Sequence, residues 1–141
     1  MARNRKQVSN FKYREHKEKV EDELVTVIDM CKAQQRDKAT AFLRHVSCAP
    51  EKTVFLGNER QLNDLARFCT NVENTSIVGI DPTYNMGKFY VTVTTYRQPM
   101  LYVKGTNQHP VLLGPCLIHT KKTFDSYFSL PSQMLRFRPD L

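Results

Sequence analysis

Apolar residues recur at helical spacing in two stretches of the first half of the chain. A helix is predicted for residues 20–31, where one face carries Val20, Leu24, Val27, Ile28 and Cys31. A second helix is predicted after Asn58, because asparagine is a favoured N-cap and Gln61 can complete a capping box. Its apolar face comprises Leu62, Leu65, Ala66, Phe68 and Cys69. Both patterns are typical of packing helices.

Short β-type runs lie between and after these helices. Residues 42–46 and 53–56 each predict a strand. From Ser76 onward three strands are predicted, at about 76–81, 88–97 and 110–119. The first is continuously apolar until Asp81, and the second alternates between one buried and one polar face.

The connections indicate how these strands are arranged. Asn85 and Gly87 tolerate positive φ, so the first two strands are expected to form an antiparallel hairpin. Thr123 can cap a final helix, whose apolar residues are Phe124, Tyr127, Phe128, Leu130, Met134, Leu135 and Phe137. The predicted fold class is α+β, with a three-stranded antiparallel sheet followed by a helix and preceded by a small helix and strand region.

The net charge of +7 is concentrated at the N-terminus. Residues 1–19 carry seven Lys or Arg against two Glu. Such a run is commonly a solvated tail, and the alternative is a nucleic-acid contact through Arg3, Arg5, Lys6, Lys12 and Arg14. No apolar run approaches the ~18 residues of a membrane span, and Met1 precedes charged residues. A nuclear or cytoplasmic protein, not secreted and without a membrane partner, is expected.

Asp81 is the candidate for metal chemistry, because a carboxylate at the end of a buried strand is costly unless a cation meets it. The alternative is a turn-forming aspartate before Pro82. The chain has four cysteines, and only His45 and Cys48 approach the spacing of a zinc site. Buried or half-buried thiols in a reducing compartment are the favoured interpretation of Cys31, Cys48, Cys69 and Cys116.

Other residues near the predicted strands have two interpretations each. His119 follows a strand and could approach a phosphate or a metal, but a hydrogen-bonded structural role is favoured. Tyr84, Tyr90 and Tyr96 could stack on bases, but cross-strand packing is favoured.

The residues from Ser76 to Arg97, together with His109-Pro110-Val111, Leu113-Gly114-Pro115 and Ile118-His119, resemble the start of the transposase domain of Mutator-like (MULE-type) elements. The resemblance extends to Thr53–Thr70 and covers about residues 50–141. It implies a ribonuclease H-like fold and two-metal cleavage of DNA by an Asp-Asp-Glu set with Mg²⁺ or Mn²⁺. Asp81 matches the first aspartate. Lys121 and Lys122 either face DNA in the full enzyme or are solvated.

The other two carboxylates of the set do not follow, since the only acids after Asp81 are Asp125 and Asp140. We therefore expect a truncated transposase fragment that is inactive alone and binds no metal stably. The alternative is a non-catalytic module that binds nucleic acid or protein. The expected regions are a basic arm (1–19), a lead-in region (20–72) and a truncated domain (73–141). In the resembling fold a fourth strand would pair with the first, so residues 76–81 would form an uncovered edge and favour self-association.

Overall fold

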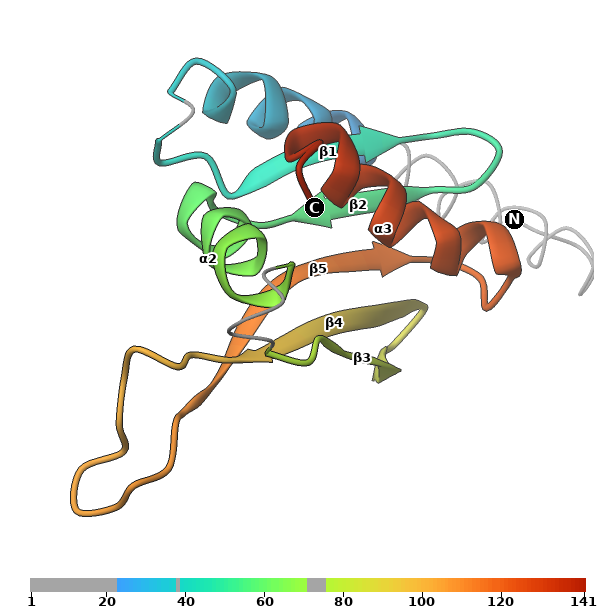
Figure 1. The fold of residues 1–141 in the computed structure, drawn as a ribbon. Coiled ribbons are helices and arrows are strands. Elements are labelled where there is room, and N and C mark those ends of the chain that lie inside the picture. The colour runs from blue at the N-terminus through green and yellow to red at the C-terminus, as the bar shows by residue number, and fades with distance from the viewer. Residues whose placement is uncertain (1–22, 38, 71–75) are drawn as a thin grey trace, which may run out of the picture.

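A five-stranded antiparallel sheet organises the protein, as seen in a computed structural model that describes residues 23–37, 39–70 and 76–141 (Figure 1). The elements are β1 (Leu43–Ser47), β2 (Thr53–Leu56), α2 (Glu59–Cys69), β3 (Gly79–Met86), β4 (Phe89–Arg97), β5 (Val111–His119) and α3 (Phe124–Phe137). Residues 23–34 are helical as well. The strand order is β1-β2-β5-β4-β3. The predicted α+β class with an antiparallel sheet is confirmed.

The prediction of a three-stranded sheet was wrong, because β1 and β2 join the same sheet on the far side of β5. Phe55 of β2 pairs with Leu117 of β5, and β1 pairs with β2. Phe55 and Leu117 are both fully buried, so this pairing closes the core. The lead-in region and the 73–141 region thus contribute strands to one sheet.

The hairpin between β3 and β4 forms as predicted, with Gly87 at φ 66° in a two-residue turn. Glycine adopts this left-handed conformation without the clash that a Cβ would bring. Asn85 remains in the strand, since β3 continues to Met86 instead of ending at Asp81. The register between β3 and β4 shifts between Asp81 and Tyr84, which marks a β-bulge around Pro82.

The two predicted helix caps are also confirmed. Asn58 caps α2 and forms a reciprocal capping box with Gln61. The Thr123 side chain accepts a hydrogen bond from the Ser126 N–H at the start of α3. Figure 1 shows both helices on one face of the sheet, where Phe55, Leu62, Leu117 and Leu130 form the buried core cluster.

The apolar face predicted for α3 is only partly buried. Leu130 is buried, with Met134 and Phe137 packed against the core cluster. In contrast, Phe124, Phe128 and Leu135 are exposed, at 78%, 59% and 49% of their surface. The predicted helix is confirmed, and these three of its apolar residues face the solvent. The helix buries one stripe and leaves a second apolar stripe in solvent.

A long connection between β4 and β5 extends away from the sheet (Figure 1). Residues 98–110 are held by backbone hydrogen bonds, among them the Val103 N–H to the Gln108 carbonyl at 2.8 Å and the Gln98 N–H to the Pro110 carbonyl at 2.9 Å. Exposed apolar residues line its first half: Met100, Leu101, Tyr102 and Val103. Within the part of the chain that the structure describes, no helix is long and apolar enough to cross a membrane.

Candidate functional site

Asp81 lies on β3, which has a neighbour on one side only among the described residues. Its side chain is exposed, so the expected burial of this carboxylate at a strand end was wrong. The apolar residues before it are open to solvent too, with Ile77 85% and Ile80 57% exposed. The edge position explains this exposure, because an edge strand is covered on one side only.

Pro82 directly follows Asp81 and has no backbone N–H to offer a further strand. The bulge around it also bends the edge. A partner strand could therefore form a regular ladder with the residues up to Asp81, but not through Pro82. Proline, a bulge and a charged side chain on an edge strand are all features that limit uncontrolled pairing.

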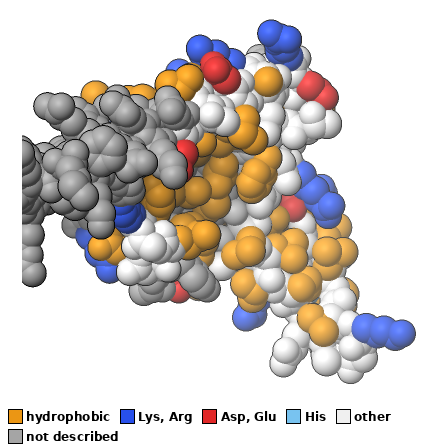
Figure 2. Space-filling model, turned by 180° about the vertical axis from the view of Figure 1, so that it is seen from behind, with side chains coloured by type: hydrophobic (Ala, Val, Ile, Leu, Met, Phe, Trp, Pro, Cys, Tyr) orange, Lys and Arg blue, Asp and Glu red, His pale blue; other side chains and the backbone are white. Residues whose placement is uncertain are grey.

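The side chain of Asp81 belongs to the face of the sheet that points away from α2 and α3. Asp81 pairs with Val93, and Val93 pairs with Cys116, so all three share one face. The core residue Leu117 is the next residue along β5 and points to the opposite face. Figure 2 shows the molecule from behind, with hydrophobic side chains gathered over the strands.

The two acids that follow Asp81 in sequence do not complete a metal site with it. Asp125 lies in the first turn of α3, which packs against the other face of the sheet. Asp140 forms an ion pair with Arg138 at 2.7 Å, and the hydrogen bonds from Arg138 lower the pKa of Asp140. Among the described residues, no group of three or more His, Cys, Asp or Glu could hold a metal. These residues therefore do not fit a two-metal centre, which needs several carboxylates.

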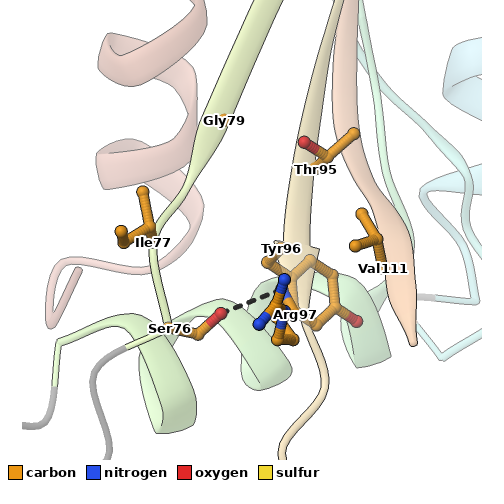
Figure 3. Close-up of a pocket in the computed structure, with 7 residues that line it drawn as sticks. All are labelled: Ser76, Ile77, Gly79, Thr95, Tyr96, Arg97 and Val111. Atoms are coloured by element: carbon orange, nitrogen blue, oxygen red, sulfur yellow. Dashed lines mark hydrogen bonds between the residues drawn. The ribbon is translucent and has the colours of Figure 1, made fainter. Parts of the chain in front are cut away.

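A hollow of about 350 Å³ lies at the start of β3, without Asp81 in its lining (Figure 3). It is bordered by the chain just before β3 and by residues of β3, β4 and β5: Ser76, Ile77, Gly79, Thr95, Tyr96, Arg97 and Val111. The Arg97 N–H donates to Ser76 Oγ at 2.9 Å, which ties the chain before β3 to the end of β4. The Thr95 side chain packs closely over Gly79, where a Cβ would lie 2.6 Å from Thr95 Oγ1.

His119 is a structural residue, as favoured from the sequence. Its ring is fully buried, with Nδ1 2.6 Å from the Lys121 carbonyl and Nε2 2.9 Å from Thr92 Oγ1. Since a carbonyl can only accept, Nδ1 carries the proton, and Nε2 accepts from the hydroxyl of Thr92. Tyr90 and Tyr127 pack against the ring, with centroids at 5.8 and 5.5 Å. Both nitrogens of His119 are thus engaged inside the fold.

The two lysines after β5 differ in their contacts. Lys121 Nζ lies 3.8 Å from Glu51 Oε1, and the Lys121 side chain is 64% exposed. Lys122 Nζ lies 4.7 Å from the centroid of the Tyr90 ring, a cation–π contact. Tyr90 is half-buried, as its predicted packing role requires. Both lysines remain accessible at the same end of the sheet.

Glu51 is a residue that the sequence pattern did not single out. Its carboxylate accepts hydrogen bonds from Ser126 Oγ and from Thr123 Oγ1, the latter at 2.9 Å. The Ser126 hydrogen bond, followed by those of Thr123 and the nearby Lys121 charge, lowers the pKa of Glu51. Glu51 therefore ties the loop before β2 to the start of α3. Neither a motif nor a spacing links residues this far apart in sequence.

The remaining candidates have structural surroundings. Tyr96 is buried and donates to Asp64 of α2 at 2.8 Å; burial and then this carboxylate raise the Tyr96 pKa. His45 Nδ1 lies 3.4 Å from Arg136 Nη1, and burial followed by the Arg136 charge lowers the His45 pKa. Cys48 is exposed, so the predicted burial is wrong for this thiol. The predicted burial is correct for Cys31, which is buried, and for Cys69 and Cys116, which are half-buried.

The basic arm 1–19, with Arg3, Arg5, Lys6, Lys12 and Arg14, lies outside the described residues. The side chain of Tyr84 is also outside the described set.

Comparisons of the chain with family models, with curated proteins and with solved structures found no match.

Proposed function

We propose that this chain carries the N-terminal part of a Mutator-like transposase domain with a ribonuclease H-like fold, and that it does not cleave DNA by itself. The observation that carries the proposal is the strand order β5-β4-β3, with Asp81 on β3 at the edge. The resembling fold has this order for its first three strands, followed by a helix, and its first aspartate lies on the first strand. β1 and β2 are additional to that arrangement.

The absence of catalysis by this chain follows from the carboxylates of the described residues. Two divalent cations ~3.5–4 Å apart require several oxygen ligands, and a lone aspartate cannot hold both. Asp81 shares its face of the sheet with apolar Val93, whereas Asp125 belongs to a helix on the opposite face. We therefore expect weak binding of one cation at Asp81 at most.

Two measurements test this proposal. Plasmid nicking by the chain with Mg²⁺ or Mn²⁺ should not exceed that of its Asp81→Asn variant. Titration of Mn²⁺ into the ¹⁵N-labelled chain should broaden amide signals near Asp81 weakly, and Asp81→Asn should abolish the effect while Asp125→Asn preserves it. Nicking that survives purification and depends on Asp81 would overturn the inactivity. Broadening centred away from Asp81 would contradict its role as a former metal ligand.

The family assignment has a separate test. A chimera joins this chain to the segment of a Mutator-like transposase that supplies the second aspartate and the glutamate. If β3 is the first strand of that domain, the chimera nicks DNA with Mn²⁺ and loses this activity on Asp81→Asn but not on Asp125→Asn. A folded chimera whose nicking is unaffected by Asp81→Asn would refute the assignment.

A second role, binding of a further strand, is favoured by the edge itself. Ile77 and Ile80 expose large apolar surfaces beside the edge of β3, which has no further strand next to it among the described residues. Such an edge can add a strand from a partner or from a second copy of this chain. Association of the protein with itself is the simplest form of this role, and its dependence on concentration is a direct test.

A further inference from the structure

Three neighbouring strands place lysines at one end of the sheet. Thr53 of β2 pairs with His119 of β5, and His119 pairs with Tyr90 of β4, so the start of β2, the end of β5 and the start of β4 lie in one row. The lysines flanking this row are Lys52, Lys88, Lys121 and Lys122. Figure 1 shows the β3–β4 turn, the end of β5 and the start of α3 at this same end.

The acids at this end offset only part of that charge. Glu51 is mostly covered and already accepts hydrogen bonds from two hydroxyls. Asp125, in the first turn of α3, is exposed. Glu23 also lies at this end, in the lining of one hollow with Lys52 and Lys88. Among the described residues, four lysines thus stand against three acids, one of which is engaged inside the fold. The excess of positive charge favours a polyanionic partner.

Two exposed aromatic rings lie in the first turns of α3, shortly after Lys121 and Lys122 in the chain. Phe124 and Phe128 are 78% and 59% exposed, and their rings stack with centroids 5.7 Å apart and an interplanar angle of 12°. They occupy positions i and i+4 of α3, on a different stripe from the buried Leu130. Neither ring contributes to the buried core. A stacked, exposed pair of rings offers flat apolar faces to a ligand.

We infer that Phe124 and Phe128, with Lys121 and Lys122, form a platform that binds unpaired strands of nucleic acid. Flat aromatic rings stack on bases of any identity, and lysines neutralise the phosphates between them. In a duplex the base faces are stacked on one another, so the rings have no base face to contact. The combination of rings and lysines therefore selects a single strand. The inference does not rest on the transposase proposal, because neither Asp81 nor the β3 edge contributes to the platform.

The test measures binding of the full chain to labelled oligo(dT) of about 12 nucleotides and to a duplex of the same length by fluorescence anisotropy. We expect tighter binding of the single strand. The double variant Phe124→Ala/Phe128→Ala should lose about tenfold or more of single-strand affinity and little of duplex affinity. Phe124→Tyr/Phe128→Tyr should preserve the preference, and Phe124→Leu/Phe128→Leu should not, because leucine is apolar but has no ring. Oligo(U) is titrated in parallel. If the chain binds oligo(U) more tightly than oligo(dT), the preferred single strand is RNA.

Two controls separate the platform from other surfaces. Leu135→Ala removes an exposed apolar residue of the same stripe of α3 that carries no ring, and it should leave the affinity unchanged. Lys121→Gln/Lys122→Gln should reduce the slope of log K against log salt by about 1.4, whereas Lys104→Gln, in the 98–110 connection, should not. Phosphate contacts by the basic residues of 1–19 would be independent of base stacking, so the ratio of the two affinities isolates the platform.

Two results would overturn the inference. One is a wild-type chain that binds oligo(dT) no better than the duplex, or not at all. The other is an alanine double variant, with unchanged circular dichroism and melting temperature, that retains single-strand affinity within about twofold. Because both phenylalanines are mostly exposed, their replacement should leave the fold intact.

Discussion

Replacing Ile77 and Ile80 with lysine should weaken self-association of the chain through the β3 edge. Full burial of an isoleucine side chain contributes about 1.5–3 kcal/mol. With 85% and 57% of these residues exposed, about 2–4 kcal/mol per copy is available. Only Ile80 lies within β3, and Ile77 lies just before it, so a paired strand is taken to cover about half of this surface. In a symmetric dimer both copies contribute, which gives about 2–4 kcal/mol in total.

This magnitude predicts that Ile77→Lys/Ile80→Lys raises the dissociation constant roughly 30- to 1,000-fold, since each 1.4 kcal/mol is a factor of ten. Sedimentation velocity from about 1 to 100 µM measures the effect. Leu135→Lys is the matched control, because it places a lysine at an exposed apolar position of α3, outside the sheet. A wild-type chain that is a monodisperse, cooperatively melting monomer at the highest concentration would refute the reasoning. So would a lysine double variant that associates as strongly as the wild type.

Three further predictions concern stability and reactivity. Gly114→Ala should destabilise the fold by about 1–3 kcal/mol in a denaturant titration, because its Cβ would lie 2.4 Å from Oγ1 of the buried Thr94; adding Thr94→Ala should recover part of the loss. Glu51 has a lowered pKa in the folded state, so its stabilisation is present at neutral pH and is lost as the pH falls below about 4.5 through the folded pKa. The fall in melting temperature between pH 7 and pH 3 should therefore be smaller for Glu51→Gln than for the wild type, and an equal fall would contradict this. Iodoacetamide should alkylate exposed Cys48 before Cys116, whose pKa is raised by burial; mass spectrometry of timed samples reveals the order.

Local features of the fold could be predicted because their causes lie within a few residues. Asn58 and Gln61 satisfy each other's hydrogen bonds at the start of α2, and Gly87 supplies the positive φ of the hairpin. These interactions depend on spacing along the chain. The pairing of β2 with β5 does not, since Phe55 carries no local sign of which strand lies beside it. The predicted sheet therefore had two strands fewer than the sheet in the structure.

The candidate sites divide in the same way. The role of His119 followed from its position at a strand end, and its two hydrogen bonds agree with it. The exposure of Phe124 and Phe128 could not be predicted, because two phenylalanines four residues apart give the same pattern whether they face the core or the solvent. Asp81 was expected at the end of a buried strand, and its exposure follows from the edge position of β3. The resemblance implied an edge at residues 76–81, whereas the apolar run before Asp81, taken alone, indicated burial.

The central position of β5 has a consequence for how the chain is made. Leu56 of β2 pairs with Cys116 of β5, sixty residues later. At synthesis rates of about 5–20 residues per second, β2 waits about 3–12 s on the ribosome before its partner has been made. Until then Phe55 lacks the strand that covers it. A chain shortened at residue 72 would keep Phe55 without its partner strand. The regions before and after residue 72 therefore fold as one cooperative unit, and folding finishes only when β5 has been synthesised.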